Sequence, residues 1–273
     1  MFDFDAELAE HYGAFTSYTS AVSPALVEYY GENPTAEVDR LLDLYATSER
    51  TVLDLGCGAG QTLCRLAPKV KHIWGLDQNQ ELLAATRLRA ERLGLENITT
   101  VYGSSYDAEA IASLPDATFE LAFSRRGPNF SEQLVPKLRQ EAMVVQEFVS
   151  GFDGYPLGEI FGRRHYTPYY YTDHELIIST YAGLGLFPVS SKVYFYEEYF
   201  RDGEHFEAYL KQMWAMLSNW RLPPCPYEAA RDRAALELYV RYNTTPKGVR
   251  LLRQRKVYVL RRAPVAFYPC QKL

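Results

Sequence analysis

The chain has few of the residues that build disulfide frameworks and metal centres. Its 273 residues include only four cysteines and five histidines. No two cysteines form a Cys-x-x-Cys pair, and no histidine lies at metal-ligand spacing from one; the cysteines are Cys57, Cys64, Cys225 and Cys270. The pattern supports neither a disulfide scaffold nor a zinc site, so we expect no bound metal and a reducing compartment.

Long apolar segments are missing as well. No apolar stretch approaches the length of about 18 residues that a membrane-spanning helix needs. The first residues, MFDFDAELAEHYG, are acidic and lack the positive start and apolar run of a secretory signal. We therefore expect a cytoplasmic protein with no membrane partner. With 47% hydrophobic residues, the chain can bury the core of one large domain.

Positive charge is in deficit overall but concentrated in one segment. The formal net charge of −5 disfavours a dedicated nucleic-acid binder. Residues 1–50 hold ten acidic and two basic side chains, whereas residues 247–262 hold seven basic ones and no acidic one. We interpret these segments as two solvated faces that attract each other across the fold; the alternative is that the basic segment binds RNA.

The hydrophobic pattern divides the chain into a helical start and an alternating remainder. Residues 1–48 predict a helical N-terminal cap, with helices over 6–12, 24–30 and 35–45. Residues 49–273 alternate short apolar strands with amphipathic helices, which is typical of a parallel sheet covered on both faces. The predicted fold is an α/β domain with a doubly wound, mostly parallel, seven-stranded sheet and helices on both faces.

Seven segments have the pattern of strands in this domain. They cover 51–55, 72–77, 97–103, 118–124, 142–150, 187–198 and 256–262. Residues 131–140 predict a helix that Pro136 shortens or breaks. Two insertions, near 151–172 and 204–246, are expected to act as lids over a site.

A glycine-rich loop follows the first strand of this domain. It reads Asp54-Leu55-Gly56-Cys57-Gly58-Ala59-Gly60, and Asp77 ends the second strand 21 residues after Gly56. Ligands of open α/β sheets bind beyond the carboxyl ends of the strands, where glycine lets a ligand approach bare backbone. At that edge, Asp77 can accept hydrogen bonds from both hydroxyls of a ribose.

The details of the loop discriminate between cofactors. The Gly-Lys-Ser/Thr of a P-loop is absent, and Gln61 stands where a dinucleotide fingerprint needs a third small residue. Asp54, two residues ahead of the first glycine, would repel a pyrophosphate. The same carboxylate suits a cationic ligand with an amino acid tail.

Two motifs carry a resemblance to a known family. VLDLGCGAG (52–60) followed by GLDQNQELL (75–83) resembles the first two motifs of class I methyltransferases that use S-adenosylmethionine (SAM). The order of elements extends the resemblance over roughly residues 48–200. It implies SAM as cofactor and S-adenosylhomocysteine (SAH) as product. The implied cofactor contacts in the two motifs are Asp54 near the amino group, Gly56, Cys57, Gly58 and Gly60 in the loop, Asp77 at the ribose and Gln78 at the adenine edge.

The later motifs of the family are only partly present. The third strand is often followed by Gly-Asp-Ala in the family, whereas here the chain reads Gly103-Ser104-Ser105-Tyr106-Asp107. The resemblance implies that Ser105 and Tyr106 supply a backbone contact and an aromatic wall. Asp107 would then replace the displaced carboxylate. The alternative is ordinary loop packing.

The fourth strand ends in Phe123-Ser124-Arg125-Arg126, and in the family this tip faces both SAM and the acceptor. Ser124 is therefore a candidate cofactor contact. The Asn/Asp-Pro-Pro-Tyr/Phe motif of enzymes that methylate adenine or glutamine amines is absent. Arg125 and Arg126 offer forked donors for a carboxylate or phosphate of the substrate. Alternatively, at least one of them pairs with an acid of the N-terminal cap.

The segment 151–172 is expected to cover the acceptor. His165 is the candidate general base, because an ordinary histidine titrates near working pH, and Tyr166 is a candidate substrate contact. The alternative for His165 is a histidine of a surface loop. Transfer from a sulfonium depends mainly on alignment and exclusion of water, so the sequence need not carry a covalent nucleophile.

These observations predict a SAM-dependent methyltransferase that acts on an oxygen or nitrogen atom of a small-molecule acceptor, as a monomer or homodimer. Three alternatives stay open. They are an RNA methyltransferase that uses the basic segment, a protein that binds SAM or SAH without turnover, and an NAD-dependent oxidoreductase, which Gln61 and Asp54 disfavour.

Overall fold

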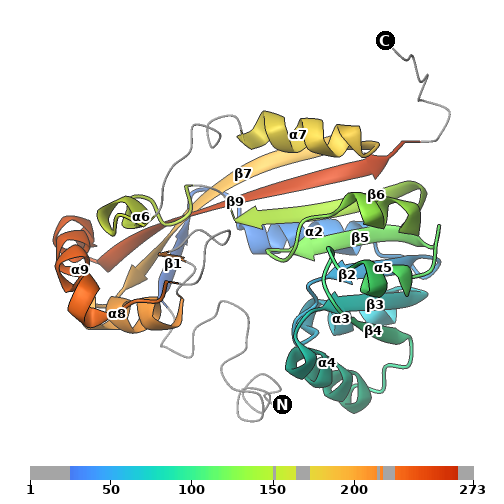
Figure 1. Cartoon of the computed structure of the whole chain (residues 1–273), viewed down its shortest axis with the longest axis horizontal. Coiled ribbons are helices and arrows are strands. Elements are labelled where there is room, and N and C mark those ends of the chain that lie inside the picture. The colour runs from blue at the N-terminus through green and yellow to red at the C-terminus, as the bar shows by residue number, and fades with distance from the viewer. Residues whose placement is uncertain (1–24, 150–151, 164–172, 214–215, 218–224, 264–273) are drawn as a thin grey trace.

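A nine-stranded sheet organises the protein (Figure 1). The computed structural model describes the chain outside residues 1–24, 150–151, 164–172, 214–215, 218–224 and 264–273. The strands are β1 (Leu26–Tyr29), β2 (Thr51–Leu55), β3 (His72–Asp77), β4 (Ile98–Tyr102), β5 (Phe119–Arg125), β6 (Leu138–Val149), β7 (Leu186–Phe200), β8 (Thr244–Thr245) and β9 (Gly248–Arg262). Their order is β1-β7-β9-β6-β5-β2-β3-β4, and β8 pairs with β9 outside this path.

Helices cover both faces of this sheet. The helices are α2 (Pro34–Tyr45), α3 (Gln61–Leu66), α4 (Gln80–Arg92), α5 (Ala108–Ala112), α6 (Leu157–Ile160), α7 (Asp173–Gly183), α8 (Gly203–Gln212) and α9 (Ala229–Asn243), with 3-10 turns η1 (Ala67–Lys69) and η2 (Glu132–Lys137). Within the described ranges, no helix is both long and apolar enough to cross a membrane. The α/β class is confirmed. The strand count of seven is wrong, because β1 and β8 are additional.

Two helix predictions are also wrong. Residues 26–29 form β1, which pairs antiparallel with β7 from Leu26↔Tyr199 to Tyr29↔Tyr196. A segment this short gains little as an isolated helix, whereas the free edge of β7 supplies hydrogen-bond partners. Residues 132–137 form only a 3-10 turn, since Pro136 lacks a backbone N–H, and β6 begins at Leu138. The helix over 35–45 is confirmed as α2, and the one over 6–12 lies outside the described residues.

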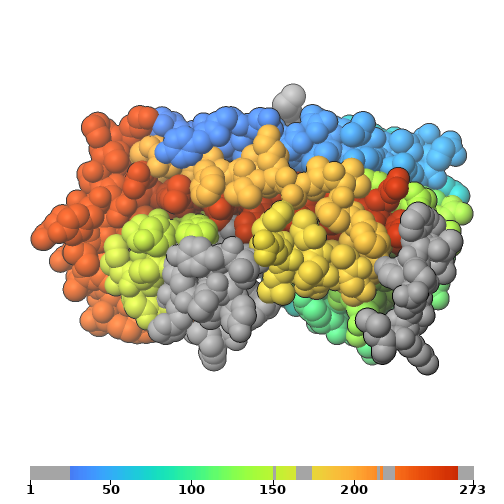
Figure 2. All heavy atoms as spheres, turned by 90° about the horizontal axis from the view of Figure 1, so that it is seen from above, coloured from blue at the N-terminus to red at the C-terminus, as the bar shows by residue number. Residues whose placement is uncertain are grey.

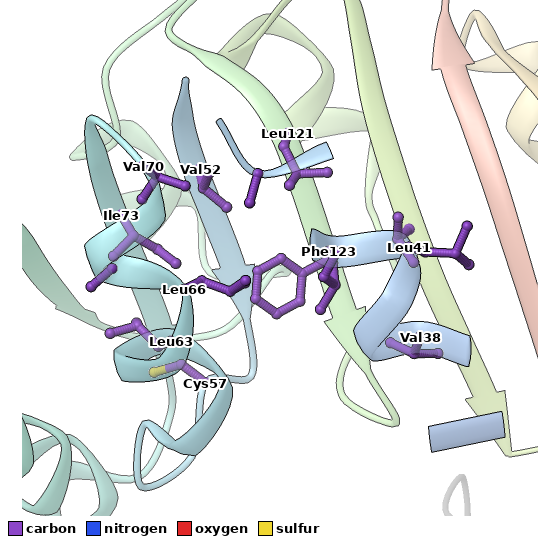
Figure 3. Packing of buried hydrophobic residues seen from close by; sticks show 14 of the residues in the cluster. Val38, Leu41, Val52, Cys57, Leu63, Leu66, Val70, Ile73, Leu121 and Phe123 are labelled. Carbon is purple, nitrogen blue, oxygen red and sulfur yellow. The ribbon is translucent and has the colours of Figure 1, made fainter. Parts of the chain in front are cut away.

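The two faces of the sheet bury separate apolar cores. One core lies under α2, α3 and α4, where Figure 3 shows Phe123 of β5 between Leu66 of α3 and Leu41 of α2. The other lies under α5 and α7, and Phe119, Tyr181 and further apolar side chains from β6 and β9 fill it. The strands β4, β3, β2, β5 and β6 run parallel, so their carboxyl ends form one common edge.

The strands β7 and β9 form a two-stranded ribbon that extends beyond the parallel strands. They pair over their full length, from Leu186↔Arg262 to Phe200↔Val249, whereas β6 ends at Val149 opposite Arg255. The overhang therefore projects at the carboxyl edge of the parallel strands. Figure 2 shows β7 along the length of the molecule, with β1 and α2 on one long side and α6 and α7 on the other.

The overhanging ribbon carries a second lobe, which Figure 1 shows at the far end from α4. The described parts of the segments predicted as insertions, α6, α8 and α9, pack there against the ends of β7 and β9. Their apolar core includes Phe200, Phe206, Tyr209, Leu236 and Tyr239. The lobe therefore has a core of its own beside the carboxyl edge.

The basic segment 247–262 lies mostly inside the sheet. Three of its side chains, Arg253, Arg255 and Lys256, are buried in β9. At the exposed end, Lys247 pairs with Glu28 through contacts of 2.6 and 2.7 Å between Nζ and the carboxylate. This pair joins the basic segment to the acidic first 50 residues, as we expected, but the three buried side chains show that the segment is not a wholly solvated face.

Candidate functional site

The glycine loop and Asp77 meet at the carboxyl edge of the sheet. The loop runs from the end of β2 to the start of α3, and its first residue, Gly56, donates its N–H to the carbonyl of Leu76 at 2.7 Å. The Asp77 carboxylate accepts hydrogen bonds from Gly58 N at 2.8 Å and from Asn79 N at 2.9 Å. A carboxylate has about four acceptor positions, so Asp77 keeps capacity for further donors.

Two positions of the loop favour glycine for different structural reasons. Gly58 has a left-handed φ of 56°, and a Cβ built there would meet no atom within 4 Å. At Gly56, by contrast, a Cβ would lie 2.7 Å from the Pro128 ring, so the loop after β5 packs directly on that backbone. Gly58 is therefore the position where bare backbone faces open space, while Gly56 serves the packing of the protein itself.

Asp54 is buried beneath this loop. Burial, together with the nearby Asp77 carboxylate, raises the pKa of Asp54 well above its ordinary value, against the opposing charge of Arg125. A carboxyl group in this setting gains from a neighbouring cation. Cys57 beside it packs in the apolar core under α3 (Figure 3), and burial raises the pKa of its thiol, which suits a packing residue and not a nucleophile.

The predicted contacts after β4 and β5 are brought to the same edge. Ser105 and Ser124 are both fully buried, and neither hydroxyl oxygen has a hydrogen-bond partner among the residues that the structure describes. Gln78 and Tyr106 are exposed at the surface beside the loop. The role of Asp107 as a substitute for the missing carboxylate of the family motif stays a prediction. The Asp107 side chain caps α5 by accepting from Glu109 N and Ala110 N, as the alternative of ordinary loop packing expects.

The two adjacent arginines have different surroundings. Arg125 donates from Nη1 to Asp39 of α2 at 2.8 Å and to Thr62 of α3 at 3.0 Å, so it links α2 to the helix that follows the glycine loop. This is the structural pairing that we considered for at least one of them. Arg126 has a left-handed φ of 58°, and its Nε lies 3.8 Å from a carboxylate oxygen of Glu147.

Sequence reasoning missed a buried charged group beside Arg126. Asp153, only 1% exposed, accepts from Arg253 Nε at 2.9 Å, from Arg255 Nη1 at 2.6 Å and from Gln254 N at 2.8 Å. Arg253 and Arg255 lie two residues apart in β9, so their side chains share one face of the strand, and this spacing was the available signal.

The remaining predicted residues, His165 and Tyr166, lie outside the described residues. The described part of the chain contains no group of three or more side chains that could hold a metal ion.

A glycine loop after β2, an acid that ends β3 and a parallel sheet with helices on both faces define a class I methyltransferase fold. Residues 52–145 match the family model described as a methyltransferase domain. This segment of the chain therefore matches a methyltransferase domain, in agreement with the predicted family.

The sequences of curated relatives match this domain over part of their length. A probable cobalt-precorrin-6B C(15)-methyltransferase of Methanothermobacter thermautotrophicus is 34% identical over 65 residues, 23% of this chain and 33% of that one. The uncharacterized methyltransferase YcgJ of Bacillus subtilis is 28% identical over 100 residues, 37% of this chain and 38% of its own. The chain thus spans little more than a third of the curated relatives it matches.

Solved structures extend the similarity beyond this segment. The crystal structure of YcgJ superimposes with a TM-score of 0.57 at 13% identity, over 84% of this chain and 99% of YcgJ. A Bacillus halodurans protein classed with the methyltransferases gives a TM-score of 0.59 at 13% identity, over 84% of this chain and 100% of the other. These similarities establish the fold.

Proposed function

We propose that this chain is a SAM-dependent methyltransferase of a small-molecule acceptor. The observation that carries the proposal is the meeting, at one edge of the sheet, of the open Gly58 backbone, the Asp77 carboxylate and the buried Asp54. Bound SAM supplies a methyl group activated by a sulfonium. The protein's part is to hold and align the reactants with water excluded.

The residues present fit this cofactor. Asp77 keeps acceptor capacity for ribose hydroxyls, and Asp54 offers a carboxylate to the cationic amino acid end. At the same edge, the buried hydroxyl oxygens of Ser105 and Ser124 have no partner within the described part of the chain, and buried polar atoms of this kind are normally satisfied. Gln78 and Tyr106 are exposed and are proposed to contact the adenine. The other loop contacts, Gly56, Cys57 and Gly60, shape the turn.

The acceptor side is proposed in less detail. We retain an oxygen or nitrogen acceptor atom, and the C(15)-methyltransferase named above makes carbon the alternative. The burial of Arg253, Arg255 and Lys256 removes much of the surface on which RNA binding would depend, which favours a small molecule. Arg126 and Tyr166 remain substrate-contact candidates and His165 the candidate base. The cap 1–48 and the second lobe are proposed as covers of the acceptor, in a cytoplasmic monomer or homodimer.

Calorimetry with SAM, SAH, NAD and ATP tests the cofactor, and transfer of labelled methyl from SAM to a panel of small molecules and to RNA tests the reaction. We expect SAM and SAH to bind and NAD and ATP not to bind. Tight NAD binding without a SAM signal would contradict the proposal. SAM binding without transfer to any acceptor would favour the alternative of a binding protein without turnover.

The affinity for SAM is expected to weaken as pH falls. The pKa of Asp54 is raised, so below that pKa the carboxyl is neutral and no longer attracts a cation; above it the ionised form does. The dissociation constant should then rise by up to about tenfold per pH unit on the acidic side. Calorimetry over a series of pH values measures this dependence.

Asp54→Asn is the variant for this prediction, with Asp116→Asn, an exposed aspartate at the opposite edge of the sheet, as control. We expect Asp54→Asn to bind SAM weakly with a flat pH profile, and Asp116→Asn to follow the wild type. An unchanged slope in Asp54→Asn would remove Asp54 from the site.

A further inference from the structure

Two polar side chains of α4 bind the backbone of the glycine loop. Thr86, which is fully buried, donates from its hydroxyl to the carbonyl oxygen of Gly58 at 2.8 Å. Arg89, 8% exposed, donates from Nε to the carbonyl oxygen of Ala59 at 3.1 Å. Side chains three positions apart lie on the same face of a helix, so one face of α4 binds two consecutive carbonyl groups of the loop. α4 packs beside α3, the helix that the loop enters (Figure 1).

Both polar groups of the Gly58 backbone are thereby bound within the protein. Its N–H donates to the Asp77 carboxylate at the end of β3, and its carbonyl accepts from Thr86. Only residues 78–79 separate β3 from α4, so neighbouring parts of the chain fix the two polar groups. The open side of Gly58, where a Cβ would meet no atom within 4 Å, is therefore held in one orientation.

Thr86 also lies directly against the last glycine of the loop. A Cβ at Gly60 would be 2.8 Å from Thr86 Cγ2 and 2.9 Å from Thr86 Oγ1. These distances are well inside the optimal separation of about 3.5–4.0 Å between non-bonded carbon atoms. The threonine therefore contacts the loop in two ways, since its branched side chain packs against Gly60 and its hydroxyl bonds to Gly58. A substitution that keeps the branched shape and removes the hydroxyl can separate the two contacts.

Packing alone does not explain a threonine at this position of α4. The adjoining core, formed by Ala59, Leu82 and Ala85, is apolar. Alanine would favour the helix more than threonine does, because a branched side chain loses rotamer freedom in a helix. A buried hydroxyl also needs a hydrogen-bond partner. The hydroxyl of Thr86 bonds to the loop, which points to the loop as the reason for the residue.

We propose that Thr86 is a positioning residue of the cofactor site, and that its hydroxyl holds the Gly58 peptide in the orientation that the amino acid end of SAM requires. In the proposed function, the buried Asp54 beneath the loop attracts this end. The ribose acceptor depends less on the loop, because the Asp77 carboxylate is also held by Asn79 N at 2.9 Å. Loss of the hydroxyl should therefore weaken binding of the amino acid end and spare the adenosine. This inference rests on the proposed function and adds a residue to its cofactor site.

Calorimetry of the full chain with SAH and with 5′-methylthioadenosine tests the proposal. The second ligand has the adenine, ribose and sulfur of SAH but lacks its amino acid end. Thr86→Val keeps the branched shape of the side chain and removes the hydroxyl. We expect this change to lower the affinity for SAH by about fivefold or more, the factor that one neutral hydrogen bond contributes. The affinity for 5′-methylthioadenosine, measured by displacement where binding is weak, should stay within about twofold of the wild type.

Two further variants control this experiment. Thr86→Ser keeps the hydroxyl and lacks the methyl group, so it should bind SAH within about twofold of the wild type. Thr118→Val is the matched control, because Thr118 also donates to a backbone carbonyl, that of Asp116, at 2.8 Å, but at the opposite edge of the sheet. It should bind both ligands as the wild type does. Thermal unfolding shows that each variant is folded, and Thr86→Ala replaces the valine variant if that one does not fold.

Several results would overturn this assignment. Unchanged SAH affinity in Thr86→Val would show that the hydroxyl does not matter. An equal loss for both ligands would indicate a general loosening of the site. Serine and valine variants that lose SAH affinity equally would assign the effect to packing of the methyl group. A wild type that binds SAH but not 5′-methylthioadenosine would also overturn it, since the adenosine would then have no site of its own. If the wild type does not bind SAH, the proposed function itself is wrong, so the two failures are distinguishable.

Discussion

Replacement of Asp77 by alanine is expected to reduce the affinity for SAM and SAH by about 100-fold or more. In the proposed complex this carboxylate accepts from two ribose hydroxyls, and each bond to a charged group contributes about 1.5–3 kcal/mol. The change also removes the acceptor that holds Gly58 N and Asn79 N, so the loop loses its fixed position beside β3. Calorimetry with both ligands measures the effect.

Asp77→Asn separates charge from shape in this experiment. The amide keeps one acceptor oxygen, so we expect an intermediate affinity, whereas Asp116→Ala, far from the loop, should bind as the wild type does. Thermal unfolding of each variant shows whether lost binding follows lost structure. If a folded Asp77→Ala protein binds SAM and SAH as tightly as the wild type does, Asp77 does not bind the ribose. The proposed cofactor site at the glycine loop would then be wrong.

Replacement of Asp153 by alanine is expected to destabilise the protein by about 3–5 kcal/mol. Removal of one partner from a buried ion pair leaves the other charge poorly compensated, and here both Arg253 and Arg255 lose the carboxylate that they share. Arg253 keeps its pair with Glu198 at 2.6 Å, whereas the nearest acid left to Arg255 is Glu147, at 3.9 Å. This is a large fraction of the free energy of unfolding of a typical domain. Urea unfolding followed by fluorescence measures it.

Asp43 provides the matched control for this experiment. It also accepts from two cations, Arg65 at 2.6 Å and Lys69 at 2.9 Å, but its side chain is 42% exposed. Water solvates those charges when the aspartate is removed, so Asp43→Ala should cost about 1 kcal/mol or less. If Asp153→Ala and Asp43→Ala lower the free energy of unfolding equally, burial does not determine the cost of removing the aspartate. Asp153→Asn, which keeps one acceptor, should fall between them and serves if the alanine variant does not fold.

The same aspartate should contribute to acid unfolding. Burial by itself would raise the pKa of Asp153, but Arg253 and Arg255 lower it to about 2. Because this pKa lies below the ordinary value of an aspartate, the stabilisation is present above about pH 4 and is lost as pH falls from there through about 2. It amounts to about 2 kcal/mol, and Asp153→Asn should flatten that part of the stability curve.

The order of elements was largely predictable because local patterns determine it. The strands at 51–55 and 72–77 agree with β2 and β3 residue for residue, since each is a short apolar run bounded by turn residues. β1 was not predictable, because its four residues become a strand only when β7 provides an edge 170 residues later in the chain. The intrinsic strand propensity of these four residues contains no information about a pairing partner so far along the chain.

One part of the candidate site could likewise be predicted from the sequence, and another part could not. The glycine loop and Asp77 could be found from spacing along the chain, because both follow strand ends that a parallel sheet brings together. The buried group around Asp153 could not, since Asp153 follows β6 and meets Arg253 and Arg255 only through the pairing of β6 with β9. Of the two adjacent arginines, the sequence could not tell which one α2 would engage.

The position of β9 in the sheet bears on how the chain folds as it is synthesised. β9 is the last strand of the sheet along the chain, yet it lies between β6 and β7 and pairs with both. The parallel half from β2 to β6 can form on the ribosome as it emerges, but β7, β1 and the second lobe have no strand to attach to until β9 follows. Until then the nascent chain exposes the unpaired edge of β6, and a release from the ribosome before residue 248 would leave that edge open to aggregation.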